Sequence, residues 1–189
     1  MENSISTHSP NWLKWIAPEK FNDKDLFRIV VFFVFHSPCE GLSARGKLLT
    51  EYGWNTPWKK PYWLNKQLRQ ASSNYELLFS ASSYALMDKA LDDANLKDNF
   101  PSDLNRERIA IYDVKKNQFQ SVFYHIRNAF AHGRLNMIDL NDECIFVFED
   151  VRKAKKPNIS ARMILRKSTL LKWIDLIEGG EKEYKKAQM

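Results

Sequence analysis

The sequence predicts a mainly α-helical fold with a small C-terminal β-hairpin and a final helix. Three observations favour this class: an apolar stretch behind a helix-capping residue, two segments with near-helical apolar spacing, and strand-like patterns only after Gly133. A chain of 189 residues is long enough for one domain with a substantial core. The expected parts are an N-terminal arm (1–20), a helical bundle (21–135), a hairpin with a helix (140–180) and a tail (181–189).

Two long helices are expected in the first half of the chain. The first begins after Asp23, which can cap it, runs through the apolar stretch 29–35 and ends near Pro38. The second spans about 64–96, where apolar residues recur at near-helical spacing, and it follows a proline-punctuated loop at 52–64.

The third expected helix, about 114–132, separates apolar and polar side chains. At about 100° per residue, one side of it is a core stripe made of Phe119, Val122, Phe123, Ile126 and Phe130. The nearly opposite side is a polar stripe made of Ser121, His125, Asn128 and His132. Arg127 lies between the two sides, and Gly133 is a natural stop residue, so His132 is expected at the helix end.

After Gly133 the pattern changes to that of β-strands. Residues 144–148 and 161–166 predict two strands of an antiparallel hairpin, joined by a basic linker at 153–158. A last helix is expected over 170–177, ending at the glycine pair that follows it.

The composition indicates a globular protein of the cytoplasm. The longest apolar run is far too short to span a bilayer, and the polar N-terminal segment does not resemble a secretory leader. Cys39 and Cys144 lie too far apart for a metal pair or a disulfide framework, which favours two free thiols. The net charge of +6 favours an anionic partner, either nucleic acid or an acidic protein, and no membrane.

The polar stripe and Arg127 beside it together hold the groups needed to cleave RNA without a metal. In that reaction a base removes the proton of the ribose 2′-hydroxyl, a cation stabilises charge on the phosphate, and an acid protonates the departing 5′-oxygen. Histidine suits the acid or base role, arginine can donate two hydrogen bonds to a phosphate, and asparagine can orient either reactant.

The string 126–134, Ile-Arg-Asn-Ala-Phe-Ala-His-Gly-Arg, resembles the signature of the HEPN superfamily, in which a histidine follows an arginine after a short spacer. The resemblance implies an HEPN-like antiparallel helical bundle and a metal-independent endoribonuclease without a cofactor. It implies that Arg127, Asn128 and His132 are catalytic and that two signatures meet across the two-fold axis of a homodimer. The products would carry a 2′,3′-cyclic phosphate and a 5′-hydroxyl.

Three further residues are auxiliary candidates for this cleft. His125 lies one helical stripe away, although an exposed or interface histidine is the alternative for it. Arg134 stands where HEPN toxins silenced by adenylylation carry tyrosine, so that control is not expected and Arg134 is a candidate for binding phosphate instead. Glu40 could join the cleft from the first helix.

Two basic or aromatic segments are candidates for contact with RNA. Their members are Trp54, Trp58, Lys59 and Lys60 in the proline-rich loop, and Arg152, Lys153, Lys155 and Lys156 in the hairpin turn. The alternatives are packing of the aromatic residues on the protein itself and a solvated face for the basic run.

The function that the sequence favours is cleavage of single-stranded or looped RNA by 2′-hydroxyl transesterification, as a toxin or an antiphage-defence effector. Such an activity implies an RNA substrate and an antitoxin or regulatory protein that restrains it. The alternative is a non-catalytic dimeric module that binds RNA, a nucleotide or a protein partner.

Overall fold

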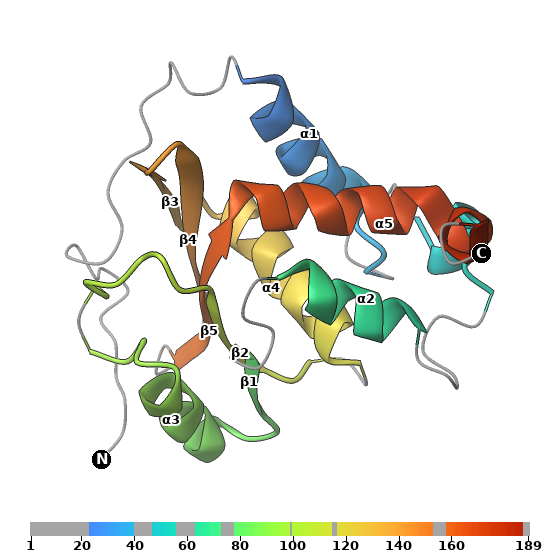
Figure 1. Cartoon of the computed structure of the whole chain (residues 1–189). Helices are drawn as coiled ribbons and strands as arrows, with labels where there is room; N and C mark the ends of the chain where they lie inside the picture. Colours follow the sequence, from blue (N-terminus) through green and yellow to red (C-terminus); the bar gives the residue numbers. More distant parts are fainter. Residues whose placement is uncertain are drawn as a thin grey trace.

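The protein is built around a five-stranded β-sheet with helices on both faces (Figure 1). The computed structural model describes residues 23–39, 47–55, 63–72, 78–98, 100–114, 117–152 and 158–186. The helices are α1 (Lys24–Val31), a π-helical turn (Phe32–His36), a 3₁₀ turn (Leu49–Tyr52), α2 (Trp63–Ala71), α3 (Tyr84–Asp93), α4 (Gln118–Ala131) and α5 (Lys167–Lys186). The strands are β1 (Leu78–Ala81), β2 (Arg108–Tyr112), β3 (Leu135–Leu140), β4 (Glu143–Arg152) and β5 (Asn158–Arg166).

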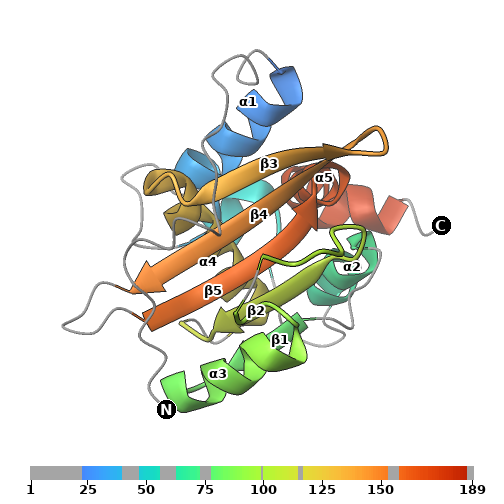
Figure 2. The ribbon, with the colours of Figure 1, turned by 90° about the vertical axis from the view of Figure 1, so that its left-hand side faces the viewer.

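The strands lie in the order β1-β2-β5-β4-β3. β1 and β2 are parallel, and every other neighbouring pair is antiparallel. β2 and β4 therefore end, and β5 begins, at the same end of the sheet (Figure 2). β5 lies at the centre with both faces covered, which explains why residues from Ile159 to Leu165 are almost all buried.

Two apolar layers hold the helices on the sheet. On one face the side chains of α1, α2, α4 and α5 pack together with Phe146 and Phe148 of β4. On the other face α3 packs against Ala110, Val147 and Ile164. Consecutive strand residues point to opposite faces, so each strand contributes to both layers.

The expectation of a mainly α-helical, HEPN-like bundle is wrong, because the protein is a mixed α/β fold. The hairpin of residues 144–148 and 161–166 is confirmed, but it forms the middle of a larger sheet rather than a small appendage. The expected single helix over 64–96 is also wrong, since α2, β1 and α3 occupy that range. The N-terminal arm lies outside the described residues.

Local signals explain the ends of α4, the helix that carries the candidate residues. The side chain of Asn117 accepts hydrogen bonds from the backbone N–H groups of Phe119 and Gln120 and so caps its first turn. At its other end Gly133 adopts a φ of +62°, a left-handed conformation that glycine reaches without strain. The predicted core stripe is confirmed, because Phe119, Val122, Phe123 and Ile126 are buried and Phe130 packs against them.

α5 continues beyond its expected end, with a bend at Gly180 where φ is +70°. Among the described residues, no helix combines the length and the apolar character needed to cross a membrane.

Candidate functional site

An open pocket lies where β2 and β4 end and β5 begins. We call it the sheet-end pocket. Its volume is about 440 Å³, and it is lined by Tyr84, Tyr112, Val114, Tyr124, His125, Asn128, His132, Asp150, Val151, Arg152 and Ser160. Three of these belong to the polar stripe of α4, and Tyr124 lies on the same helix. The others come from the strands, from the segment just after β2 and from the start of α3. The fold therefore brings part of the predicted stripe into an accessible cavity.

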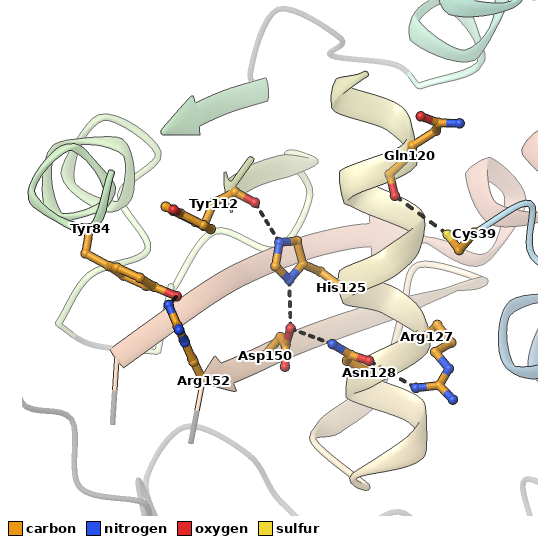
Figure 3. A network of polar contacts seen from close by, with 9 residues as sticks. All are labelled: Cys39, Tyr84, Tyr112, Gln120, His125, Arg127, Asn128, Asp150 and Arg152. Carbon is orange, nitrogen blue, oxygen red and sulfur yellow. Dashed lines mark hydrogen bonds and ion pairs between the residues drawn. The ribbon is translucent and has the colours of Figure 1, made fainter. Parts of the chain in front are cut away.

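His125 and Asp150 form a buried polar pair at the base of this pocket. His125 Nδ1 lies 2.7 Å from Asp150 Oδ2, and Nε2 lies 2.8 Å from the backbone oxygen of Tyr112 (Figure 3). A carbonyl oxygen only accepts, so Nε2 must carry a hydrogen, and the imidazole side chain is 0% exposed. The alternative of an exposed histidine at position 125 is therefore wrong. Neither ring nitrogen of His125 is open to a ligand.

A second carboxylate lies close to this pair. Burial raises the pKa of Asp113, and the electrostatic attraction of His125 opposes that rise. Both ring nitrogens of His125 are already engaged by Asp150 and Tyr112, so this histidine holds the site in place rather than contacting a substrate.

Asn128 links the buried pair to the surface. Its Nδ2 donates to Asp150 Oδ2 over 3.2 Å, and its Oδ1 accepts from Nη1 of Arg127, also over 3.2 Å. Arg127 is half-buried and is not one of the residues that line the pocket. Arg127 is thus connected to this pocket through its hydrogen bond to Asn128.

His132 is exposed at the end of α4, where its backbone N–H still donates to the oxygen of Asn128. It lines the sheet-end pocket together with Asn128, as predicted from their separation of four residues on one helix. Of the two histidines in the pocket, only His132 presents its imidazole to solvent.

Aromatic rings and one cation form the far wall of the pocket. Tyr84 and Tyr112 are stacked, with ring centroids 4.5 Å apart and ring planes 5° from parallel. The guanidinium carbon of Arg152 lies 5.6 Å from the centroid of the Tyr84 ring, and its Nη1 donates to the Tyr84 hydroxyl over 3.4 Å. Arg152 is exposed and contacts no carboxylate among the described residues.

Arg134 lies elsewhere, on the other face of β4. Its guanidinium forms an ion pair with Glu149, and Arg162 donates to the same carboxylate from Nε over 2.9 Å. Burial lowers the pKa of Arg162, and the charge of Glu149 opposes that change. Arg134 is therefore engaged in a structural cluster and does not line the pocket as a phosphate ligand.

One of the predicted RNA-contacting residues is in the core. The Trp54 side chain is 1% exposed, and its indole N–H donates to the backbone oxygen of Ile177 over 3.0 Å, so no ring face is open to a base. That assignment is wrong for Trp54, and the alternative of packing on the protein itself is confirmed. The candidates that lie outside the described residues are Glu40, Trp58, Lys59, Lys60, Lys153, Lys155 and Lys156.

Asp150 and the three tyrosines of the pocket were not predicted from the sequence. Asp150 follows Glu149 at the end of an apolar strand, and a carboxylate in such a place signals a buried partner. The partner could not be named, because it lies 25 positions away and meets Asp150 only through the packing of α4 on β4.

In comparisons with known proteins, no family model, no curated protein and no solved structure gave a significant match.

Proposed function

We propose that the protein is a metal-independent endoribonuclease that cleaves single-stranded or looped RNA in the sheet-end pocket. One observation carries this proposal: the same cavity is lined by an exposed histidine, a fixed carboxamide and an exposed arginine that contacts no carboxylate among the residues the structure describes. A ribonuclease needs a proton-transfer group, a hydrogen-bonding group and a cation at the phosphate, and His132, Asn128 and Arg152 are of these types.

In this reaction the ribose 2′-oxygen loses its proton to an imidazole and attacks the phosphorus. The bond from phosphorus to the 5′-oxygen breaks, and an acid protonates that oxygen. The products are a 2′,3′-cyclic phosphate and a 5′-hydroxyl. Asn128 is held by Asp150 on one side and by Arg127 on the other, so Arg127 acts as a positioning residue for Asn128.

The reaction uses both a base and an acid, and His132 can supply one of them in each subunit. A homodimer that joins two sheet-end pockets across a two-fold axis would bring the second imidazole. We further propose a cytoplasmic role as a toxin or antiphage-defence effector, with an antitoxin or regulatory protein as its restraint.

The test is incubation of purified protein with labelled RNA in EDTA. We expect His132→Ala to reduce cleavage at least about 100-fold, the lower end of typical losses for a general acid or base. His36→Ala is the matched control, because this histidine does not line the pocket. Cleavage that needs a metal would overturn the mechanism, and full activity of His132→Ala would overturn the assignment of the site.

The second candidate is a non-catalytic module that binds RNA or a nucleotide. The stacked tyrosines and Arg152 favour it, because they suit binding without any proton transfer. This function predicts RNA binding by wild-type protein and by His132→Ala, with no cleavage by either.

A further inference from the structure

The wall of the sheet-end pocket opposite α4 contains groups that can stack on a planar aromatic ligand. Tyr112, Tyr84 and Arg152 follow one another as two parallel rings and a guanidinium. The two tyrosines are half-buried and come from different elements, the end of β2 and the start of α3, so the backbone of each is fixed by the sheet or by a helix. Such a pre-formed stack loses little conformational freedom when a ligand binds.

The exposed end of this stack is Arg152. An arginine lying beside an aromatic ring keeps its edge N–H groups for an anion while its plane stays open to stacking. Unlike Arg134 and Arg162, which share the carboxylate of Glu149, Arg152 contacts no acid in the described part of the chain. Its charge is therefore available to a phosphate.

The remaining lining fits a sugar and a phosphate rather than another ring. Asn128, His132 and Ser160 offer an amide, an imidazole and a hydroxyl, all on the same cavity as the stack. A volume of about 440 Å³ lies within the usual range of small-ligand sites, which is about 300–1,000 Å³. One pocket thus combines a stacking wall, a cation and hydrogen-bonding groups, which are the groups that recognise an unpaired nucleotide.

We infer that the sheet-end pocket binds one unstacked nucleobase of an RNA strand against Tyr84, Tyr112 and Arg152, beside the bond presented to His132. This inference deepens the proposed function, on whose RNA substrate it rests. A base inside a duplex is stacked on both faces and cannot enter, so the pocket selects single-stranded RNA through its tyrosines rather than through sequence readout.

Binding is measured with His132→Ala protein, so that the RNA stays intact, by fluorescence anisotropy of a fluorescein-labelled single-stranded octamer. We expect the same strand in a duplex to bind at least about 10-fold more weakly, because stacking on a protein aromatic contributes a factor of this order per base. Adding Tyr84→Ala should weaken single-strand binding about 10-fold, because Tyr84 supports the Arg152 guanidinium at the exposed end of the stack. Tyr84→Phe, which keeps the ring, should change binding little.

Phe27→Ala is the matched control, since Phe27 is an aromatic residue on α1 that is 67% exposed and does not line the pocket. Arg152→Ala is the second variant, chosen because an exposed arginine can be removed without risk to folding. It should weaken binding and lower the slope of log affinity against log salt by about one.

Equal affinity for single strand and duplex, or a Tyr84→Ala protein that binds as tightly as Phe27→Ala, overturns the inference. If the inference fails in this way but wild-type protein still cleaves RNA in EDTA, the proposed ribonuclease function stands and only the nucleobase site is lost. If the stacking effects appear but wild-type protein cleaves nothing, the inference stands and the proposed catalysis fails. Absence of RNA binding overturns both.

Discussion

Glu149 and Asp150 are neighbours on β4, yet they belong to two different kinds of polar cluster. Glu149 lies on the face toward α3, is 0% exposed and is shared by two arginines. Asp150 lies on the face toward α4, where it meets His125 and Asn128 beside the sheet-end pocket. In the first cluster Glu149 and Arg162 are fully buried and only Arg134 is partly exposed, whereas the second cluster borders an open pocket.

This difference shows that two neighbouring residues of one strand can serve separately the stability of the fold and the candidate site. Arg162 also donates to the backbone oxygen of Leu96 over 2.8 Å, so the Glu149 cluster ties the loop after α3 to the sheet. The Asp150 cluster instead fixes Asn128, whose helix presents His132 to the pocket. We therefore expect changes at Glu149 to affect stability alone, and changes at Asp150 to affect activity at a smaller cost in stability.

The largest expected effect is that of Glu149→Gln. Removing this charge leaves the buried guanidinium of Arg162 without its anion, which should lower the free energy of unfolding by about 3–5 kcal/mol. Urea denaturation followed by circular dichroism measures this. A loss below about 1 kcal/mol, within the range of exposed ion pairs, would show that the cluster is not a structural tie.

The next effect is that of Asp150→Asn. His125 Nδ1 and Asn128 Nδ2 both contact the same oxygen, Oδ2, and an amide can place either an oxygen or an NH2 group there. It therefore cannot donate to a neutral His125 and accept from Asn128 at once, so we expect a loss of about 1–3 kcal/mol in the free energy of unfolding. RNA cleavage should fall as well, because Asn128 loses its charged partner. A stability loss larger than that of Glu149→Gln, or unchanged cleavage in folded protein, would contradict the comparison.

A smaller effect is expected for Arg127→Ala, which removes one hydrogen bond to Asn128. Loss of that bond should reduce cleavage about tenfold, equivalent to about 1.4 kcal/mol. The double variant with Asn128→Ala should be no slower than Asn128→Ala alone, because the two residues act as a unit. Additive losses would mean that Arg127 touches the substrate itself.

The smallest effect is expected for Arg134→Ala. Arg162 remains to neutralise Glu149, and the Arg134 side chain is 22% exposed, so the free energy of unfolding should fall by about 1 kcal/mol or less. Cleavage measured beside wild-type protein should not change. A marked loss of cleavage without unfolding would return Arg134 to the candidates for phosphate binding.

Local patterns were sufficient for some elements and not for others. α1, α4 and the β4–β5 hairpin follow from capping residues, a single apolar stripe and β-branched runs. β1 and β2 are short and are separated in the sequence by α3, so their pairing cannot be predicted from either segment alone. β3 alternates only weakly and gains its partner from the turn at Asn141 and Asp142, where φ is positive.

The same limit applies to the candidate site. Asn128 and His132 could be placed together because they lie on one helix, where spacing alone determines proximity. Asp150, Tyr84 and Tyr112 join them only through strand order and register, which depend on the whole sheet. Arg127 was assigned to the cleft by its motif, but its direction depends on packing around α4.

Because side chains along β4 point alternately to the two faces of the sheet, this strand cannot easily gain or lose a residue. Removing a single codon upstream of Glu149 within the strand would rotate the rest of β4 by half a turn. The glutamate would then meet the histidine, and the aspartate would face the two arginines. We therefore expect this stretch to accept substitutions far more readily than insertions or deletions.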